Sequence, residues 1–366
     1  MRIAIDARLT HYSQAGISRY IQRLVRELPP LAPAAEWSII HSRQDHRTLA
    51  GGSRVNAWTP CHHRLERWAL GVELLPHRLD LLHSPDFIPP AWGAGRFIIT
   101  VHDLNFIHYP QFLTQESLRY YSGQIKWAID QADHILADSH QTRDDLLDLL
   151  GARPDKVSTV HLAADERFRP LPSPTPALLR YNLSPGYILF VGTLEPRKNI
   201  PTLLMAYRSL LDRKASDVPL VLVGQRGWLA DDIFITLDKL RLAGRVRILE
   251  NVQGVETLVQ LYNRAGVLVI PSFYEGFGLP ALEAMACGTP VVVANRGSLP
   301  EIVGDAGLLI NPKDPDGLAA AIERTLANHE LRTALIEKGK VQVAKFTWAE
   351  TARQTWRVYR QVLETV

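Results

Sequence analysis

The sequence is poor in cysteine and carries no large excess of charge of either sign. Only Cys61 and Cys287 occur among 366 residues, and two thiols so far apart do not make a disulfide scaffold. We therefore expect a reducing compartment, the cytoplasm. Lys and Arg number 41 against 38 Asp and Glu, a balance that argues against a dedicated nucleic-acid-binding protein.

Long apolar runs are also missing. The longest, such as residues 266–270 and 290–294, are far shorter than the roughly 20 residues that a membrane helix needs. The first six residues have the pattern of a strand, and no apolar stretch follows a basic one there, so we expect no signal peptide. These features predict a protein that is soluble or peripheral to a membrane.

Short apolar runs alternate regularly with segments of helical periodicity. Several runs are apolar on consecutive residues, as is typical of strands covered on both faces of a parallel sheet. In the first half we expect strands at residues 2–7, 37–41, 81–84, 97–102, 134–138 and 157–162. In the second half we expect them at 187–191, 220–223, 246–249, 267–271, 290–294 and 307–310. Apolar residues at three- and four-residue spacing predict helices over 17–28 and 200–211.

This alternation predicts an α/β fold with two doubly wound domains. Clustered prolines predict a linker over residues 167–185, because proline disfavours both helix and interior strand. We therefore place one domain at residues 1–168 and the other at 169–345. Residues 346–366 are expected to form an amphipathic helix that Thr347 can cap. Ligands of open α/β sheets bind at the carboxyl ends of the strands, so a cleft between two facing domains is the expected site.

The most informative segment is residues 271–290, which contains Glu275 and Glu283 with a Gly-Phe-Gly-Leu-Pro run between them. A loop after a buried strand here leads into a helix with Pro280 in its first turn. The amides and partial positive charge of that helix start favour an anion such as phosphate, and the two glycines let backbone approach it closely. The two carboxylates can accept hydrogen bonds from hydroxyls of one ligand. Alternatively, Glu275 is a partner of the helix dipole and Glu283 a solvated helix residue.

A second segment, residues 192–199, reads Gly-Thr-Leu-Glu-Pro-Arg-Lys-Asn and again follows an apolar strand. Arg197 and Lys198 can neutralise a diphosphate, and arginine can do so through two parallel hydrogen bonds. Asn199 can cap the helix that begins at Ile200. The alternative interpretation is a solvated basic turn.

The first half offers two further candidates. His102 ends an apolar strand, and Asp103 can orient its ring, although a structural histidine is the alternative. The loop at residues 11–16 follows the first strand, and Gly16 precedes an amphipathic helix, an arrangement that fits the approach of a ligand.

Two tempting patterns are set aside. Residues 276–281 satisfy the dinucleotide fingerprint G-x-G-x-x-[GA], but three residues separate them from the preceding strand. Asp314 and Asp316 have the spacing of a metal-binding pair, but Pro315 and the helical pattern after it make Asp314 a helix N-cap. The histidines and cysteines show no zinc-site spacing, so we expect no metal.

Jointly, these motifs resemble retaining glycosyltransferase family 4, which has the GT-B architecture of two facing Rossmann-like domains. Residues 275–283 resemble the family's E-x7-E signature, and residues 192–199 resemble its phosphate-binding turn. Residues 101–104 resemble its first-domain histidine motif. The second half matches nearly throughout and the first half in patches.

The resemblance implies a role for individual residues. The catalytic group would comprise His102 against the donor sugar, Glu275 on the sugar hydroxyls, and Arg197 and Lys198 on the diphosphate. The substrate-binding residues, which would line the phosphates, sugar, ribose and nucleobase, would be Gly16, Asp103, Gly192, Val252, Phe277, Gly278, Leu279 and Glu283. The first domain would bind the acceptor and the second the donor, and the terminal helix would cross back to the first.

The resemblance also implies an activity: metal-independent transfer of a hexose with retention, from a nucleotide diphosphate sugar and without a cofactor. The motifs look most like those of bacterial mannosyltransferases that use GDP-mannose, but UDP-sugar enzymes share nearly all of them. We find no acidic nucleophile for the reacting face of the sugar, so front-face retention is favoured. Acceptors of this subgroup are often lipid-linked glycans, which suggests work at the cytoplasmic face of the membrane.

A first-domain segment could provide peripheral membrane contact, with an ordinary solvated helix as the alternative. The residues concerned are Trp58, Arg64, Arg67, Trp68, Leu74, Leu75 and Arg78. Other functions also remain open: a sugar-nucleotide epimerase or a phosphorylase on the same fold, a catalytically silent sugar-nucleotide-binding protein, or an NAD-dependent oxidoreductase.

Overall fold

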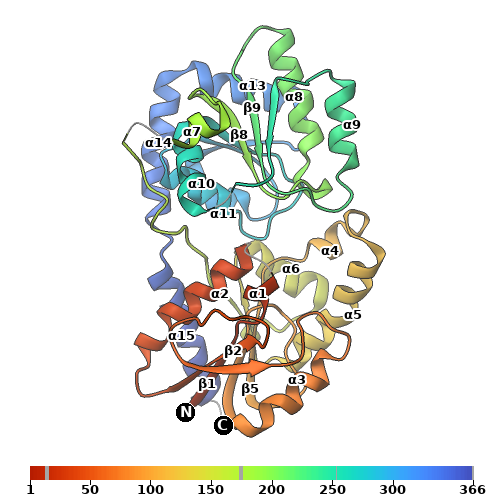
Figure 1. The fold of residues 1–366 in the computed structure, drawn as a ribbon, viewed down its shortest axis with the longest axis vertical. Helices are drawn as coiled ribbons and strands as arrows, with labels where there is room; N and C mark the ends of the chain where they lie inside the picture. Colours follow the sequence, from red (N-terminus) through yellow and green to blue (C-terminus); the bar gives the residue numbers. More distant parts are fainter. Residues whose placement is uncertain (13–15, 173–175, 253, 365–366) are drawn as a thin grey trace. The chain divides into compact units, whose positions relative to one another are not determined.

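A computed structural model describes residues 1–12, 16–172, 176–252 and 254–364. The chain divides into two compact units, each built on one parallel sheet (Figure 1). Unit 1 comprises Met1–Ile107, Glu116–Leu162 and Thr347–Val366, and unit 2 comprises His108–Gln115 and Ala163–Phe346. The backbone therefore passes between the units four times.

Unit 1 has a seven-stranded parallel sheet in the order β3-β2-β1-β4-β5-β6-β7. The strands are β1 (Arg2–Asp6), β2 (Glu36–Ser42), β3 (Ser53–Ala57), β4 (Leu79–Ser84), β5 (Ala94–Val101), β6 (His134–Ala137) and β7 (Val157–Thr159). The helices are α1 (Leu9–Tyr12), α2 (Gly16–Glu27), α3 (Glu66–Leu74), α4 (Asn105–His108), α5 (Gln115–Gln131), α6 (His140–Leu150) and α15 (Trp348–Glu364).

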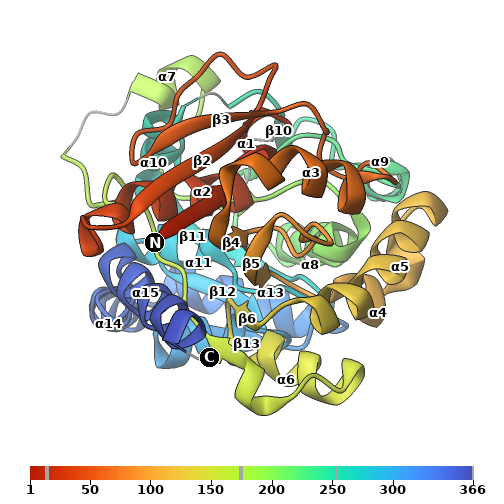
Figure 2. The same cartoon turned by 90° about the horizontal axis from the view of Figure 1, so that it is seen from below.

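Helices cover both faces of the unit 1 sheet. On one face, Leu70 and Leu74 of α3 pack into a core with Ala4, Ile40 and Phe97 from three strands. On the other face α15 packs beside α2 and against β4, β5 and β6, and Figure 2 shows α3 and α15 on opposite sides of the strands. Burial on both faces explains why these strands are apolar on consecutive residues.

Unit 2 has a six-stranded parallel sheet in the order β10-β9-β8-β11-β12-β13. The strands are β8 (Tyr187–Val191), β9 (Leu220–Val223), β10 (Val246–Leu249), β11 (Ala265–Ile270), β12 (Val291–Ala294) and β13 (Gly307–Ile310). The helices are α7 (Pro176–Tyr181), α8 (Ile200–Asp212), α9 (Asp231–Lys239), α10 (Val255–Arg264), α11 (Leu279–Ala286), α12 (Leu299–Val303), α13 (Pro315–Ala327) and α14 (His329–Val343). Helix α8 contacts α9 and α13, and helix α11 contacts α10 and α14, while α13 and α14 join the two groups (Figure 1).

The expected α/β class and all twelve expected strands are confirmed, with the strand ends matching to within three residues. The prediction of six strands per sheet was wrong for unit 1, because β3 was missed. This strand pairs only with β2 at the sheet edge, and its residues Ser53, Arg54 and Asn56 are polar. An edge strand needs no continuous apolar run, so apolar patterning does not reveal it.

Helix starts follow the expected capping chemistry at two positions. The Thr347 hydroxyl accepts a hydrogen bond from the Glu350 amide (3.2 Å) at the start of α15. Asp314 accepts one from the Gly317 amide (2.9 Å) at the start of α13, so this aspartate is an N-cap as predicted.

In the linker predicted at residues 167–185, the expectation that the prolines disfavour helix was wrong. Within it the chain forms helix α7, which begins at Pro176, a position that a helix start tolerates because proline's missing N–H has no helical partner there. The Leu171 amide also donates to the Asn263 side chain on α10 (2.6 Å), so this stretch is fastened to unit 2. Pro174, one of the clustered prolines, lies outside the described residues.

None of the helices in the described part of the chain combines the length and the apolar character that crossing a bilayer requires.

Candidate active site

Two of the predicted motifs meet at one point of the unit 2 sheet. After β8 the chain forms β9 on one side of it and later β11 on the other side, so β8 and β11 are neighbours. Because they are parallel, their carboxyl ends lie at the same edge of the sheet. The loop at residues 192–199 follows β8, and the loop at 271–278 follows β11. Such a switch point is where open α/β sheets bind ligands.

Backbone and side-chain hydrogen bonds join these two loops. The Phe273 amide donates to the Arg197 carbonyl (2.9 Å), and the Asn199 side-chain amide donates to the Pro271 carbonyl (2.9 Å). Asn199 also donates to the Pro312 carbonyl (2.7 Å). Its side chain thus ties loops together and does not cap the backbone of α8, which corrects that prediction.

Glu275 is the centre of a nearly buried ion cluster. Its carboxylate accepts hydrogen bonds from the Lys198 ammonium (2.8 and 2.9 Å), from the Arg197 guanidinium (3.0 Å) and from the Ser272 hydroxyl (2.6 Å). Arg197 further donates to the Glu195 carboxylate (2.8 Å). The structure thus brings Glu275, Arg197 and Lys198 together. Ser272, whose position one residue after Pro271 carries no distinct signal, was missed.

The charge state of Glu275 follows from these contacts. Burial alone would raise the pKa of its carboxyl group, but Lys198 and Arg197 outweigh burial and lower the pKa to about 2. Glu275 is therefore ionised at neutral pH and balances two neighbouring cations. An anionic ligand that reaches Arg197 and Lys198 competes with this carboxylate for them.

The start of α11 adds backbone donors beside the cluster. Gly278 precedes the helix with φ +95°, a conformation that favours glycine, and a Cβ there would also come within 2.7 Å of the Leu299 side chain. Pro280 occupies the first helical turn as predicted. Leu279 begins the helix, while Phe277 is buried with its ring edge-on to Phe346 (6.0 Å between centroids). Free amides at such a helix start attract anions.

Glu283 lies one turn into α11 and is only 3% exposed. The Tyr262 hydroxyl of α10 donates to its Oε2 atom (2.9 Å). The alternative of a solvated helix residue was therefore wrong. Its burial lets Glu283 act as a fixed acceptor for a neutral donor such as a hydroxyl.

Three further predicted residues occupy loop or helix-start positions. Gly192 follows β8 and has a φ of +156°, a backbone conformation that L side chains rarely adopt. Val252 is half-buried between β10 and α10. Gly16 begins α2; residues 11 and 12 of the predicted loop belong to α1, and residues 13–15 lie outside the described residues.

His102 follows β5 in unit 1 and is held at both ring nitrogens. Nδ1 pairs with the Asp138 carboxylate (2.6 Å), and Nε2 donates to the Pro85 carbonyl (2.7 Å). The predicted partner Asp103 instead accepts from the amide and side chain of Asn105. Asp138 follows β6, the neighbour of β5, and strand order was the signal that could have found it.

The His102–Asp138 pair produces a testable pH dependence. Burial would lower the pKa of His102, but Asp138 reverses this and raises it to about 9. Since the folded pKa exceeds the ordinary 6.5, the stabilisation is complete below pH 6.5 and is lost as pH rises through about 9. We expect Asp138→Asn to remove on the order of 1–3 kcal/mol of this pH-dependent stability.

The measurement is the free energy of unfolding, obtained by urea denaturation at pH values between about 6 and about 10. This interval includes both the ordinary pKa of histidine and the raised pKa of His102. Asp144→Asn, on the exposed side of α6, is the matched control and should retain the wild-type pH dependence. Identical pH dependence in wild type and Asp138→Asn would contradict the assignment.

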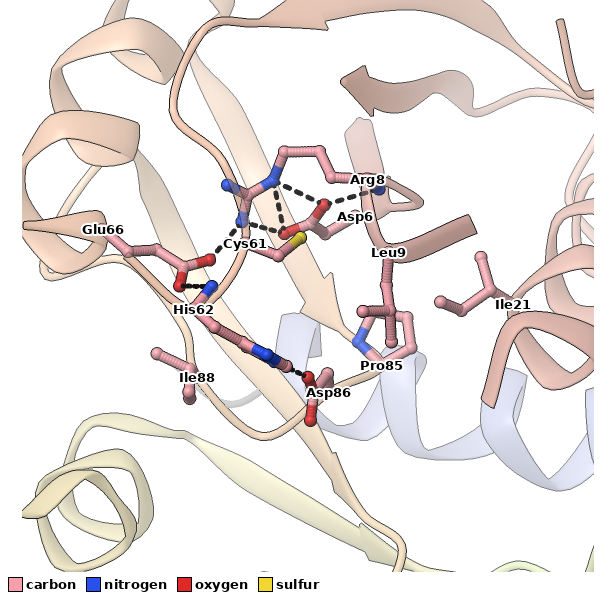
Figure 3. A pocket seen from close by; sticks show the side chains of 10 residues that line it. All are labelled: Asp6, Arg8, Leu9, Ile21, Cys61, His62, Glu66, Pro85, Asp86 and Ile88. Atoms are coloured by element: carbon pink, nitrogen blue, oxygen red, sulfur yellow. Dashed lines mark hydrogen bonds and ion pairs between the residues drawn. The ribbon is translucent and has the colours of Figure 1, made fainter. Parts of the chain in front are cut away.

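Unit 1 has a polar cluster of its own, at the switch point between β1 and β4 (Figure 3). The buried Arg8 donates to Asp6 (2.6 Å), to Glu66 (2.6 Å) and to the Thr59 carbonyl (2.8 Å). The remaining cavity measures about 10 Å³, roughly the space of one water molecule. Its charged groups satisfy one another, so the cluster fixes the loops around it.

Two protein-family models match the chain, one in each half. The family model described as "Glycosyltransferase Family 4" matches residues 15–168, and that described as "Glycosyl transferases group 1" matches residues 179–342. The second match spans both loops of the ion cluster.

The chain is also similar to individual known proteins. It is 33% identical over 386 residues to the O-antigen chain mannosyltransferase B of Escherichia coli, covering 98% of this chain and 100% of that protein. It is 27% identical to the serotype-specific mannosyltransferase WbdA of Escherichia coli over 77% of this chain but only 36% of that longer protein.

Among solved structures, the sucrose-phosphate synthase of Thermosynechococcus elongatus superposes with a TM-score of 0.80 over 100% of both chains. Its sequence identity of 22% limits that likeness to the fold. The chain has the GT-B fold and, from its full-length relative and its two matched models, belongs to glycosyltransferase family 4, the retaining glycosyltransferases that its motifs resemble.

Proposed function

We propose that this glycosyltransferase transfers mannose from GDP-mannose to a glycan or lipid-linked glycan acceptor, with retention and without a metal. The ion cluster of Glu275, Lys198 and Arg197 at the shared ends of β8 and β11 is the observation that carries the transfer activity. Similarity to the O-antigen mannosyltransferase over the whole chain supports mannose as the sugar. A lipid-linked acceptor would place the enzyme at the cytoplasmic face of a membrane.

In this proposal unit 2 binds the donor and unit 1 the acceptor. Breaking the bond between sugar and phosphate builds negative charge on the diphosphate. Lys198, Arg197 and the amides at the start of α11 would stabilise that charge more strongly in the transition state than in the ground state. These fixed cations supply the positive charge that a divalent metal provides in other enzymes, so no metal is invoked.

Glu275 would change partners when the donor binds. A diphosphate attracts both cations, which frees the carboxylate to accept hydrogen bonds from hydroxyls of the transferred sugar. Its pKa of about 2 keeps it an acceptor throughout. The acceptor hydroxyl would hand its proton to the departing phosphate on the same face.

The other predicted residues would complete the donor site. Gly192, Gly278, Leu279 and Phe277 would bring backbone close to the phosphates and the sugar. Glu283 would hold the ribose hydroxyls, and Val252 would lie by the nucleobase. From unit 1, Gly16 would line the phosphates and His102, positioned by Asp138, would add positive charge near the sugar, with Asp103 next to it in sequence.

A donor screen tests the proposal. Thermal unfolding is followed with GDP-mannose, UDP-glucose, UDP-N-acetylglucosamine and the bare nucleotides, and transfer is then measured with the stabilising donor, with and without a chelator. A ligand at ~100 times its dissociation constant adds about 2.7 kcal/mol of stability. We expect GDP-mannose to stabilise the most and the chelator to leave the rate unchanged. Preferential stabilisation by a UDP-sugar would contradict GDP-mannose as the donor. Strict metal dependence would contradict transfer without a metal.

A further inference from the structure

Helix α3 of unit 1 is apolar on two opposite faces. Its inner face packs Leu70 and Leu74 into the core beneath the sheet. Its outer face, together with the residue just before the helix and the residue just after it, carries four apolar residues that are each 48–58% exposed: Leu65, Trp68, Val72 and Leu75. They follow one another at steps of three, four and three residues, which places them along one side of a helix. We call these four residues the α3 stripe.

Two more tryptophans flank the α3 stripe. Trp92 packs against the helix at Gly71, where a Cβ would come within 2.7 Å of the indole nitrogen, and it is 40% exposed. The Trp58 amide donates to the Glu73 carboxylate of α3 (2.6 Å), while the Trp58 ring is 69% exposed. Exposed tryptophan is favourable where water meets hydrocarbon, because the ring is apolar and its N–H is polar.

Exposed arginines lie at both ends of the α3 stripe, and the exposed acid beyond its second end, Asp80, accepts a hydrogen bond from the Arg2 amide. Both acids of the helix are engaged within the unit: Glu66 pairs with Arg8, and Glu73 accepts from the Trp58 and Thr59 amides. Arg64 and Arg78, just beyond the two ends of α3, are exposed.

An open hollow of about 550 Å³ lies next to the Trp58 ring and is lined by Arg43, Gln44, His46, Asn56 and Trp58. The Arg43 guanidinium is 4.1 Å from the centroid of the Trp58 ring. A phospholipid has a phosphate next to its hydrocarbon chains. A guanidinium that is held on an aromatic ring beside an apolar stripe can contact such a phosphate while the stripe contacts the hydrocarbon.

We propose that the α3 stripe, Trp58 and Trp92 bind the surface of a bilayer that contains anionic phospholipid, with Arg43, Arg64 and Arg78 contacting the phosphates. Binding of this kind draws on buried apolar area together with attraction to anionic headgroups. The inference rests on the proposed function in one respect, since a lipid-linked acceptor would be presented at that same surface.

Vesicle co-sedimentation with the full chain tests the inference. The vesicles are phosphatidylcholine alone and phosphatidylcholine mixed with phosphatidylglycerol. We expect clear preference for the mixed vesicles, and a loss of roughly 100-fold in affinity for the double variant Trp68→Asp/Val72→Asp, because each substitution places a carboxylate where an apolar side chain would enter the bilayer. Val341→Asp, at an exposed apolar position of α14 in unit 2, is the matched control and should bind as wild type does.

Two further readouts keep the outcomes separate. Transfer to a water-soluble glycan acceptor and the melting temperature should stay at wild-type values in the double variant, because the α3 stripe lies outside the donor site and is exposed. If the wild-type protein does not bind vesicles, or if the double variant binds them as tightly as wild type does, the inference is overturned. Neither result would contradict the proposed transfer activity. A wild-type dimer that the double variant dissociates would assign the stripe to a second copy and also overturn it. Vesicle binding without transfer from any sugar nucleotide would support the membrane surface and contradict the proposed function.

Discussion

Glu275→Gln is expected to lower sugar transfer by at least ~100-fold, about 2.7 kcal/mol at 1.36 kcal/mol per decade, while the bare nucleoside diphosphate still binds. The substitution removes the carboxylate proposed to hold the sugar hydroxyls, but it also removes the counter-ion of Lys198 and Arg197. Both cations are then more available to phosphate. We therefore expect nucleotide affinity to be unchanged or increased, and calorimetric titration alongside kcat separates the two effects.

Glutamine preserves the shape of the side chain and an acceptor for the Ser272 hydroxyl, so the variant should fold. Glu256→Gln, at an exposed position of α10, removes the same charge from unit 2 and should leave turnover at the wild-type level. Turnover of Glu275→Gln within a few-fold of wild type would contradict the role assigned to this residue.

Lys198→Ala should also reduce transfer by at least ~100-fold, but unlike Glu275→Gln it should weaken nucleotide binding as well. In the proposed role of Lys198, loss of its ammonium would weaken binding of the diphosphate in both the ground state and the transition state, so the dissociation constant for the bare nucleotide should rise together with the fall in kcat. Glu275 would lose one of its two cationic partners and keep the Arg197 guanidinium, so the pKa of Glu275 should rise from about 2.

Lys239→Ala provides the matched comparison, because Lys239 is an exposed lysine at the end of α9 in the same unit. It should leave both parameters unchanged. If Lys198→Ala bound nucleotide diphosphate as tightly as wild type does, the proposed diphosphate contact of Lys198 would be contradicted. The lysine would then serve only to pair with Glu275.

Much of the fold follows from short-range patterning. Strands such as β11, with six consecutive buried residues, are visible in the sequence because a strand covered on both faces is apolar throughout. Edge strand β3 lacks that constraint and was not recognised. Helix α7 was hidden because prolines were interpreted as breakers, whereas the first turn of a helix accepts one.

The candidate site could be predicted as a set of residues but not as a set of contacts. Arg197, Lys198 and Glu275 each follow a predicted strand, which marked them as candidates. Their direct pairing depends on β8 and β11 being neighbours, and that adjacency is a property of sheet order. The same limit explains why Asp103, adjacent in sequence, was predicted as the partner of His102, while the actual partner is Asp138, which follows the neighbouring strand β6.

The position of α15 has a consequence for how the protein is made. This helix completes unit 1: the Tyr359 hydroxyl lies 2.6 Å from His83 Nδ1, and the Thr351 hydroxyl donates to the His161 carbonyl (2.7 Å). During synthesis the ribosome releases these residues only after all of unit 2 has emerged. The part of the first sheet that α15 covers, over β4, β5 and β6, therefore stays exposed in the nascent chain until the last turns are translated, and a premature stop codon ahead of residue 347 would leave that apolar area prone to aggregation.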